Sequence, residues 1–341
     1  MADVLGLLLA GLAAGDSLGS TSEFCDRAGV LEAYRRHAAR GWPFAQAGGG
    51  AFGLAPGAPT DDTELALCLV RSFREHGRFD GDDVARRMVA WLRAGPPDVG
   101  GTTRRALAAV AGGTPWYAGG RERWRDDPSY AANGSLMRNG VVPGTAASPH
   151  EALRISVLHG IITHYAPLCV LCCAAQSWLI GDALAGGAAR RGGGGAWVPH
   201  FLAAWEEWRE RCGDEHVRGY LADEGVEPAL RAAERTLRET PFGLDGFDPF
   251  RAEYEGREGS VLLTLQVAVW AAAMSVSDLP FPAPPRLPAE VFERRGPWVL
   301  GWVPMIGYDS DTYAATAGPL IAALHGGLPE PLTRGLHALA E

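Results

Sequence analysis

Apolar residues recur at intervals of three and four along most of this chain, and this spacing constrains the fold more than any other feature. In residues 63–76, for example, Leu65, Leu69 and Phe73 fall on one face of a helix, and Gly77 follows as a C-cap. The alternation at every second residue that is typical of strands does not form a convincing series. The sequence therefore predicts an all-α fold.

Helices are expected at residues 2–14, 63–76, 82–94, 102–111, 149–160, 165–181, 200–213, 227–239 and 259–275. Residues 15–19 are expected to break the first helix, and residues 41–59, rich in Gly and Pro, to form an irregular surface loop. Irregular insertions are expected near residues 181–196 and 279–297. Because no linker or repeat divides the chain, we expect one compact multi-helix domain spanning residues 1–341.

Composition excludes several classes of protein. Of 341 residues, 47% are hydrophobic and 21% are charged, which is the profile of a soluble globular enzyme. A formal net charge of −9 and the lack of a concentrated Lys/Arg patch argue against a general nucleic-acid binder. All 31 Lys and Arg residues are Arg, and Ala and Gly are abundant, as in GC-rich bacterial genomes. Cys169, Cys172 and Cys173 do not complete a zinc site, and we expect them to be buried thiols on a core helix.

The N-terminal apolar run from Leu5 to Gly15 resembles the h-region of a signal peptide. However, it has no positively charged residue before it, carries Asp3 in front and leads straight into Asp16. It is also too short to span a bilayer. We expect a buried first helix and a cytoplasmic protein with no membrane attachment. The sequence leaves the oligomeric state open, with a monomer favoured.

Two acidic clusters stand directly before apolar runs. One is Thr60-Asp61-Asp62-Thr63, and the other is Asp309-Ser310-Asp311-Thr312. Asp, Ser and Thr are favoured at helix N-termini because their side chains accept hydrogen bonds from the free N–H groups of the first turn. Each cluster alone could therefore be a solvated helix cap.

If the two clusters meet in space, they supply four carboxylates and several hydroxyls. These hard oxygen ligands suit Mg²⁺ or Mn²⁺ far better than zinc. Without cations, four neighbouring carboxylates would repel one another strongly and raise one another's pKa. A divalent-metal hydrolase site is the working hypothesis.

At this point a series of motifs resembles the ADP-ribosylglycohydrolase family, which includes the enzyme that reactivates dinitrogenase reductase. The resemblance runs from about Gly11 to Gly326. It is carried by residues 11–19 with Glu23-Phe24, by residues 60–64, by residues 98–104, by Asn133-Gly134-Ser135-Leu136-Met137-Arg138, by Thr163-His164 and by residues 307–312. Each motif alone is weak, but six in the expected order are specific.

The resemblance implies an all-helical fold around two divalent cations, Mg²⁺ or Mn²⁺. Its metal ligands would be Thr60, Asp61, Asp62, Asp309, Asp311 and Thr312. Glu23 would act as general acid/base or gate the substrate, with Asp62 as the competing base. A surface Glu at the start of a helix is the alternative for Glu23. Asp16 is expected to support the site from behind or to pack helix ends.

Substrate-binding roles also follow from the resemblance. Asp98 would pair with the guanidinium of an ADP-ribosylated arginine, although it could instead cap the next helix. Asn133, Gly134, Ser135 and Arg138 would form the loop for the pyrophosphate and ribose, although Asn-Gly alone is only a turn. His164 would lie near the ribose or phosphates. A lone His on an apolar segment is otherwise a satisfied core residue.

The function implied is metal-dependent hydrolysis of the bond between ADP-ribose and an acceptor, first of all arginine on a protein. Alternatives are an O-linked ADP-ribose on serine or a small metabolite, and a non-catalytic ADP-ribose-binding or structural member. A metallophosphoesterase would use similar metals, but the His-rich ligand sets expected of that class are missing from the sequence. Two positions depart from the family pattern. Tyr308 replaces a common Gly, and Gly101 replaces a polar residue of the dinitrogenase-reductase-activating enzyme.

Overall fold

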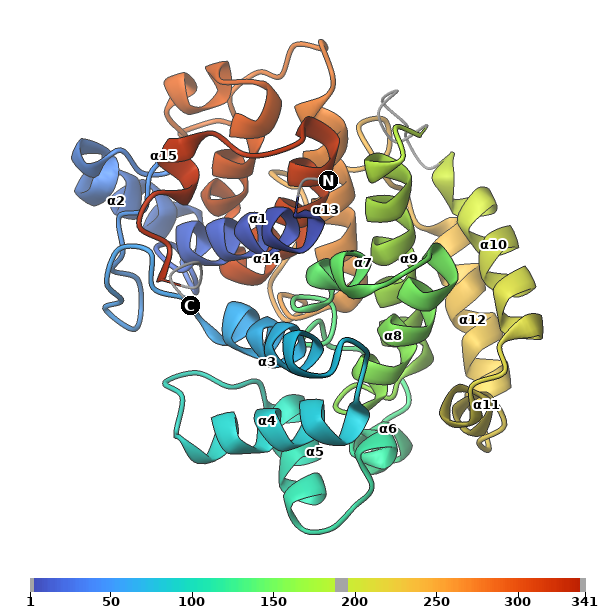
Figure 1. Cartoon of the computed structure of the whole chain (residues 1–341). Helices are drawn as coiled ribbons and strands as arrows, with labels where there is room; N and C mark the ends of the chain where they lie inside the picture. Colours follow the sequence, from blue (N-terminus) through green and yellow to red (C-terminus); the bar gives the residue numbers. More distant parts are fainter. Residues whose placement is uncertain (1–2, 188–195, 338–341) are drawn as a thin grey trace.

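The computed structural model describes residues 3–187 and 196–337, which form an assembly of helices (Figure 1). Within these ranges no strand forms, and the β-type contacts are isolated bridges from Gly49 to Leu54 and from Ala132 to Ser260. The predicted all-α fold is confirmed. The α-helices are α1 (Val4–Gly19), α2 (Arg27–His37), α3 (Asp61–His76), α4 (Gly81–Arg93), α5 (Gly101–Ala111), α6 (Arg121–Asp126), α7 (Val142–Thr145), α8 (Pro149–Ile161), α9 (Pro167–Leu184), α10 (Trp197–Arg211), α11 (Glu215–Leu221), α12 (Val226–Glu239), α13 (Val261–Ser275), α14 (Ser310–His325) and α15 (Glu330–Thr333). Short 3-10 helices are η1 (Ala38–Arg40), η2 (Trp116–Ala118), η3 (Asn139–Val141), η5 (Ala289–Glu293) and η6 (Gly296–Ile306).

Most of the predicted helices are confirmed, with ends shifted by a few residues. The helix expected at residues 63–76 is α3, and Gly77 ends it in the left-handed conformation, with φ of 66°. The other expected helices after it correspond to α4, α5, α8, α9, α10, α12 and α13. Residues 188–195, within the expected glycine-rich insertion, lie outside the described residues. The stretch 279–297 holds η5 between irregular segments.

The expected break at residues 15–19 is wrong, because α1 continues through Gly19. The glycines of this helix face α14 rather than end the helix. A Cβ on Gly15 would lie 2.0 Å from the carbonyl oxygen of Ala314, and one on Gly19 would lie 2.3 Å from that of Ser310. Glycine therefore allows two helix backbones to lie in close contact here. The prediction was wrong because it treated these glycines as residues that end a helix.

Helix α2 was missed by the sequence reading for a physical reason. Only Val30, Ala33 and His37 of this helix are buried, so its apolar periodicity is weak. Asp26 caps it by accepting a hydrogen bond from the N–H of Gly29 at 2.8 Å. The helix therefore begins after Glu23 and Phe24, which lie in the turn that precedes it.

Helix α14 lies in the middle of the fold, between α1 and α13 (Figure 1). Every residue from Ser310 to Leu324 is buried. A helix that is apolar on all sides is typical of the centre of a protein. Because α14 is central, its N-terminus and the acidic residues there start inside the protein rather than at its surface.

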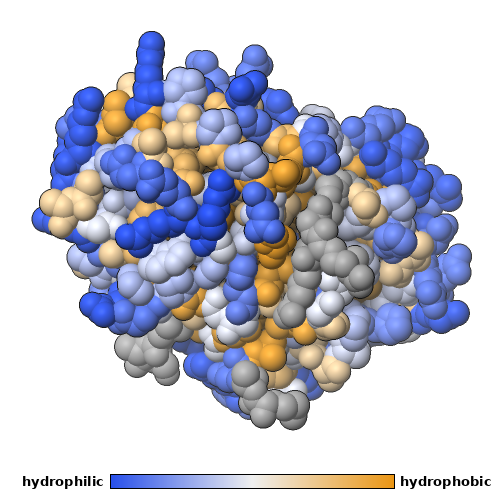
Figure 2. Space-filling model, turned by 90° about the horizontal axis from the view of Figure 1, so that it is seen from above, coloured by the Kyte–Doolittle hydropathy of each residue, from blue (hydrophilic) through white to orange (hydrophobic). Residues whose placement is uncertain are grey.

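Helix α9 is long and apolar enough, by length and composition alone, to cross a membrane, with a mean hydropathy of 1.4. However, 72% of it is buried inside the fold, as in a core helix. Its cysteines Cys169, Cys172 and Cys173 are buried free thiols, as expected. Figure 2 shows that hydrophilic side chains cover most of the face seen from above, with an apolar strip across its middle.

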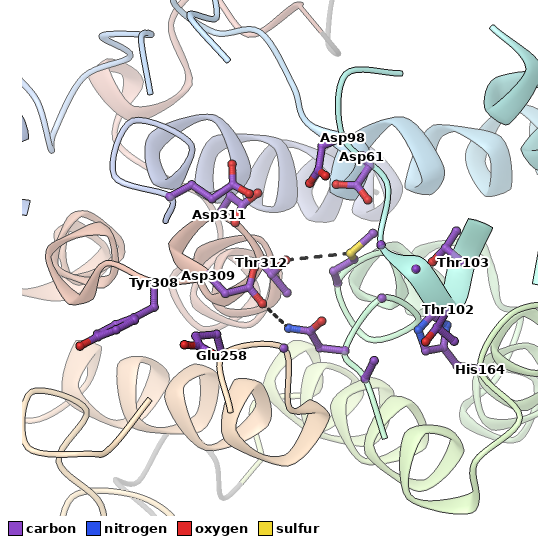
Figure 3. Close-up of a pocket in the computed structure, with 18 of the residues that line it drawn as sticks. Asp61, Asp98, Thr102, Thr103, His164, Glu258, Tyr308, Asp309, Asp311 and Thr312 are labelled. Atoms are coloured by element: carbon purple, nitrogen blue, oxygen red, sulfur yellow. Dashed lines mark hydrogen bonds between the residues drawn. The ribbon is translucent and has the colours of Figure 1, made fainter. Parts of the chain in front are cut away.

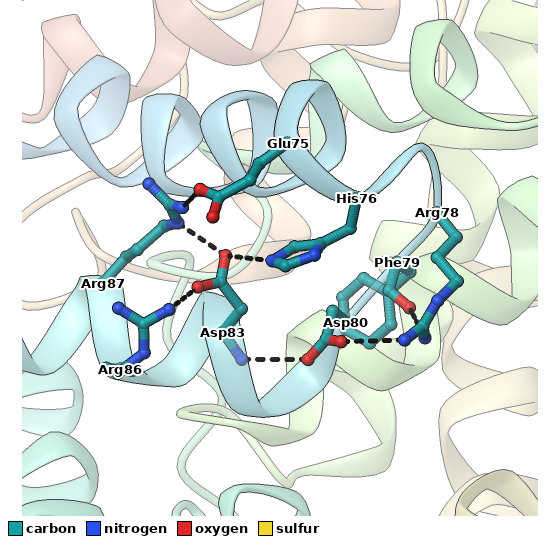
Figure 4. Close-up of polar contacts among 8 residues, drawn as sticks. All are labelled: Glu75, His76, Arg78, Phe79, Asp80, Asp83, Arg86 and Arg87. Atoms are coloured by element: carbon teal, nitrogen blue, oxygen red, sulfur yellow. Dashed lines mark hydrogen bonds and ion pairs between the residues drawn. The ribbon is translucent and has the colours of Figure 1, made fainter.

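Helix α4 is tied to α3 by a network of ion pairs around Asp83 (Figure 4). Asp83 is only 4% exposed and accepts a hydrogen bond from Arg87 Nε at 2.6 Å, and Arg86 also bonds to it. His76 at the end of α3 places Nε2 3.5 Å from the same carboxylate. Arg86 and Arg87 lie on the same helix as Asp83, so the contacts that join α4 to α3 are those of Asp83 with His76 and of Arg87 with Glu75. These contacts hold α4 beside α3, and the loop that follows α4 carries Asp98.

The close contact of α1 with α14 can be tested by Gly15→Ala. Its methyl group would overlap the α14 backbone, so we expect the free energy of unfolding to fall by about 2–3 kcal/mol in urea titrations. Gly181→Ala in α9 is the matched control, because a Cβ there meets nothing within 4 Å. The control should be neutral or stabilising by about 0.5–1 kcal/mol. Equal stability of the two variants would contradict the close contact.

Candidate active site

A cavity of about 460 Å³ opens where the N-termini of α3, α5 and α14 converge (Figure 3). Of the predicted metal ligands, those that line it are Asp61, Asp309, Asp311 and Thr312. Of the other predicted site residues, those that line it are Glu23, Asp98, Asn133, Gly134 and His164. Thr60, Asp62, Ser135 and Arg138 are not among the lining residues and are all buried. The motifs that were spread over the chain are thus gathered around one space.

The first acidic cluster lies at the start of α3. Thr60 occupies the N-cap position, yet its side chain makes no capping bond with its own helix. Its hydroxyl lies 2.7 Å from Asp16 Oδ1 and donates there. Asp62 is fully buried, and Asp61 is 8% exposed and faces the cavity. The cluster is therefore not a solvated helix cap.

The second acidic cluster lies at the start of α14. Asp309 is the N-cap residue but makes no side-chain capping bond, and it accepts a hydrogen bond from Asn133 Nδ2 at 2.6 Å. Thr312 Oγ1 lies 3.4 Å from Asp62 Oδ2, which joins this cluster to the first. Thr60 Oγ1 similarly lies 3.3 Å from an oxygen of Asp311. The two clusters, about 250 positions apart in sequence, form one group of oxygen atoms.

Asp16 on α1 holds the start of α3 in place. Its buried carboxylate accepts hydrogen bonds from the backbone N–H groups of Thr60 and Thr63, each at 3.1 Å. The hydroxyls of both threonines also donate to it. A side chain from another helix thus satisfies the N–H groups that begin α3. Asp16 both packs a helix end and supports the site, which are the two roles considered for it.

Burial makes these carboxylates unusual acids. Burial, together with repulsion from neighbouring carboxylates, raises the pKa of Asp61, Asp62 and Asp311 well above the ordinary value. Burial also raises the pKa of Asp16 and of Asp309 to about 6. Each of these groups is therefore harder to ionise than an ordinary carboxylic acid, and positive charge nearby would favour its ionised form.

The geometry of the oxygen atoms fits a divalent cation. Oxygens of Asp16, Asp62 and Asp311 lie within 4.8 Å of one another. Asp62 Oδ1 and Asp311 Oδ1 are buried and have no hydrogen-bond partner. Thr60 has one hydroxyl proton and three carboxylates within 3.3 Å, so it can satisfy only one of them. Closely spaced hard oxygens with unused lone pairs are what Mg²⁺, Mn²⁺ or Ca²⁺ bind.

Glu23 reaches the same space from the turn after α1. It is only 4% exposed, so it is not a surface residue, and its Oε2 has no hydrogen-bond partner. Burial and repulsion from Asp309, Asp98 and Asp61 raise the pKa of Glu23 to about 9. This carboxyl group therefore lies at the wall of the cavity, next to both acidic clusters.

The segment 133–138 forms the floor of the cavity. Asn133 bonds to Asp309 and, through Nδ2, to Thr264 Oγ1 at 2.9 Å. A Cβ on Gly134 would lie 2.8 Å from the His164 ring, so only glycine fits beside this imidazole. Ser135 lies behind the wall, where the Cys173 thiol donates to it at 3.5 Å.

Arg138 is fully buried behind this floor. Its guanidinium donates to the carbonyl oxygens of Gly134 (2.5 Å) and His159 (3.2 Å) and to Thr163 Oγ1 (2.6 Å). Burial lowers the pKa of Arg138 to about 10, which leaves it charged at neutral pH. Arg138 thus shapes the loop and places a positive charge below the cavity without lining it.

His164 is held in a buried position beside the cavity floor. Burial, followed by repulsion from Arg138, lowers the pKa of His164 well below the ordinary value, so the ring is neutral. Its Nδ1 is hydrogen-bonded to Thr163 Oγ1 at 2.8 Å, and Thr163 Oγ1 also accepts from Arg138. The Nε2 side of the ring faces Gly134 and the cavity.

Several lining residues were not assigned as site residues from the sequence. They are Phe24, Gly100, Thr102, Thr103, Tyr130 and Glu258. Gly100 to Thr103 belong to the 98–104 motif that carries the family resemblance, so the sequence held a signal for them. Tyr130 and Glu258 stand in irregular segments with no motif around them. Figure 3 shows Thr102, Thr103 and His164 at one end of the cavity and Tyr308 and Glu258 at the other.

Tyr308, which departs from the common family pattern, turns its ring away from the carboxylates (Figure 3). The ring stacks on Tyr254, with centroids 4.9 Å apart and planes 14° from parallel. Tyr308 has a φ of 58°, a conformation that favours glycine. The larger side chain is therefore placed at the edge of the cavity and does not fill the space between the acidic clusters.

Fold and cavity together define an all-α protein with a buried carboxylate centre that could hold a divalent cation. A family model described as ADP-ribosylglycohydrolase matches residues 3–341. The chain belongs to the ADP-ribosylglycohydrolase family and is a glycosidic-bond hydrolase.

Individual relatives agree with this assignment. The chain is 30% identical over 342 residues to ADP-ribosylarginine hydrolase Tri1 of Pseudomonas putida (strain GB-1), covering 94% of this chain and 71% of that protein. It is 40% identical over 97 residues to the ADP-ribosyl-[dinitrogen reductase] glycohydrolase of Rhodospirillum rubrum, covering 28% and 31% of the two chains. A solved structure described as an ADP-ribosylglycohydrolase-related protein complex superposes with a TM-score of 0.62, at 27% identity, over 99% of this chain and 93% of that one.

Asp311→Asn tests the cation site. In the unaltered protein, Mg²⁺ or Mn²⁺ at a hundred times its Kd should add about 2.7 kcal/mol to the free energy of unfolding. The variant keeps the side-chain shape and loses one repelling charge, so we expect it to fold without metal but to lose this stabilisation. Thermal unfolding with and without metal measures the effect. Asp278→Asn, at an exposed position, is the control. Equal metal-induced shifts in the two variants would remove Asp311 from the site.

Proposed function

We propose that this enzyme hydrolyses the bond between ADP-ribose and arginine on a protein. The observation that supports arginine is the charge of the cavity wall. Its charged side chains are all acidic, and no Lys or Arg occurs among the described residues that line it. A cationic guanidinium is favoured in such surroundings and a neutral hydroxyl acceptor is not. The relative in Pseudomonas putida carries the name of an ADP-ribosylarginine hydrolase.

We propose that two divalent cations, Mg²⁺ or Mn²⁺, complete the site. The residues that would hold them are Thr60, Asp61, Asp62, Asp309, Asp311 and Thr312. When bound, the ions would offset the repulsion between these carboxylates and bind oxygen atoms of the substrate. The unpartnered oxygens of Asp62 and Asp311 support this assignment.

Glu23 is the proposed base. It lines the cavity, whereas Asp62 is fully buried and is contacted by Thr60 and Thr312. In the reaction, water adds its oxygen to C1″ of the ribose, and the guanidine nitrogen leaves with a proton. A carboxylate whose pKa is raised is a stronger proton acceptor, once ionised, than an ordinary Glu. The pKa of Asp62 is raised as well, so it is accessibility that favours Glu23 over Asp62.

Asp98 is placed to bind the acceptor. It lines the cavity from the loop before α5, and Figure 3 shows its carboxylate close to that of Asp61. Repulsion between the two contributes to the raised pKa of Asp61. A guanidinium bound to Asp98 would relieve this repulsion and form the planar hydrogen bonds that carboxylates favour. We therefore assign Asp98 to the leaving arginine rather than to helix capping.

The pyrophosphate is proposed to bind at the end of the cavity that Thr102, Thr103 and His164 border (Figure 3). There α5 begins at Gly101, after Gly100, with no side-chain cap, so its first N–H groups are free to bind an anion. Asn133, Gly134 and His164 also line the cavity. Ser135 and Arg138 are proposed to act from behind, Arg138 through its buried positive charge.

The residues of the cavity argue against two alternative functions. An O-linked ADP-ribose on serine or a small metabolite could use the same cations, but it would leave Asp98 and Glu258 without a cationic partner. A non-catalytic role would need no base, yet Glu23 lies unpartnered at the wall.

We further propose that residues 1–341 act as one domain, as a cytoplasmic monomer.

The linkage is tested with matched substrates. Purified enzyme with Mg²⁺, Mn²⁺ or EDTA is incubated with arginine-linked and with serine-linked ADP-ribosyl peptides, and free ADP-ribose is measured. We expect release from the arginine peptide, dependent on metal. Release from the serine peptide alone would overturn the proposed acceptor, and release undiminished by EDTA would overturn the proposed cofactor.

Glu23→Gln tests the base. The amide keeps the shape of the side chain but cannot accept the proton, so kcat should fall by a factor on the order of 10²–10⁴. Binding of ADP-ribose, measured by calorimetry, should change little. Glu32→Gln, at an exposed position on α2, is the control and should keep full activity. Unchanged kcat in Glu23→Gln would exclude this residue from proton transfer.

A further inference from the structure

The rim of the cavity carries an aromatic pair that the proposed reaction does not use. Phe24 lines the cavity, and 64% of it is exposed, the largest value for a large apolar side chain among the described residues. Its ring meets that of Phe52 edge to face, with centroids 6.0 Å apart. Phe52 lies beyond the lining residues. Phe52 is half-buried, so the pair consists of the exposed Phe24 ring and a second ring packed against it. An exposed aromatic ring backed in this way at the mouth of an active site is suited to a contact surface.

The backbone around Phe24 fixes this ring at the rim. Phe24 has a φ of 61°, in the left-handed region that bulky residues rarely adopt. Its N–H donates to the carbonyl of Tyr308 at 2.6 Å, and the N–H of Tyr308 donates to the carbonyl of Cys25 at 2.7 Å. The segment that presents Phe24 is thus bonded to the residue just before Asp309. These two backbone hydrogen bonds therefore connect the segment that carries the exposed ring to the segment that leads into the acidic cluster at α14.

Phe52 is presented by a separate, glycine-built turn. Gly49 and Leu54 bond to each other in both directions, at 2.8 and 2.9 Å, and Phe52 lies in the turn between them. Gly50 has a φ of 69°, and a Cβ there would lie 1.9 Å from the carbonyl oxygen of Ser20, so the turn packs directly on the end of α1. Two independent segments therefore converge to place the half-buried Phe52 ring against the exposed Phe24 ring.

We propose that Phe24 and Phe52 form a docking surface for the protein that carries the ADP-ribosylated arginine. This inference rests on the proposed function. An arginine side chain is only a few bonds long, so its polypeptide must cross the rim when the ADP-ribose fills the cavity. Phe24 directly follows Glu23, which makes the surface continuous with the proposed site. The partner is a folded protein with apolar side chains beside the modified arginine.

The experiment compares two substrates that share the same scissile bond. One is a folded protein ADP-ribosylated on a single surface arginine, and the other is ADP-ribosyl-agmatine, which has no polypeptide. The variant is Phe52→Ser, because Phe52 does not line the cavity. Leu279→Ser is the matched control, since Leu279 is 57% exposed and lies outside the cavity lining. Circular dichroism confirms that both variants are folded.

For Phe52→Ser we expect KM for the modified protein to rise about tenfold, the effect of losing one important interface side chain. For ADP-ribosyl-agmatine, kcat and KM of Phe52→Ser should stay within about twofold of the values for the unaltered enzyme. Leu279→Ser should have the kcat and KM of the unaltered enzyme on both substrates. An equal loss on both substrates would overturn docking in favour of a contact with the guanidinium. No change on the protein substrate would overturn it outright.

Binding separates failure of this inference from failure of the proposed function. The affinity of the modified protein is measured in the Glu23→Gln background with and without Phe52→Ser. Weaker binding with Phe52→Ser supports docking even if the unaltered enzyme releases no ADP-ribose, a result that would overturn only the proposed function. Equal affinity with and without Phe52→Ser overturns docking.

Discussion

Helices α1 and α14 touch through their main chains, and the site depends on this contact. A methyl group on Gly11, Gly15 or Gly19 would overlap the backbone of α14. Their closeness places Asp16 of α1 beside the carboxylates that begin α14. Asp16 in turn receives the first N–H groups of α3. Three helices that are distant in sequence thus converge because three glycines leave room for them.

The same convergence concentrates negative charge where water is excluded. A second group of closely spaced potential ligands, Glu75, His76 and Asp83, differs from the cavity in its charge balance. There Arg86 and Arg87 pair with Asp83, so the charges are balanced within the protein (Figure 4). At the cavity, none of the described residues that line the wall is an arginine, and some carboxylate oxygens have no hydrogen-bond partner among the described residues. Repulsion of this kind, built into the fold, is relieved by a bound cation.

Local patterns predicted much of this protein because they depend on residues within a turn or two. The period of apolar residues identified α3 and α13, and the acidic clusters were visible as motifs. What was missed depends on tertiary structure. The glycines of α1 were predicted to break the helix because the α14 backbone that they contact lies some 300 positions away in the sequence. Likewise, Phe24, Tyr130 and Glu258 join the cavity only through folding. No local spacing separates Arg138, buried behind the floor, from a residue that lines it.

We propose that the carboxylates at the starts of α3 and α14 hold a divalent cation within the cavity. Anomalous diffraction from crystals grown with Mn²⁺ locates the bound ion itself. We expect anomalous peaks within coordination distance of Asp62 and Asp311. Peaks confined to Glu75, His76 and Asp83, or no peak at the cavity under saturating Mn²⁺, would contradict it.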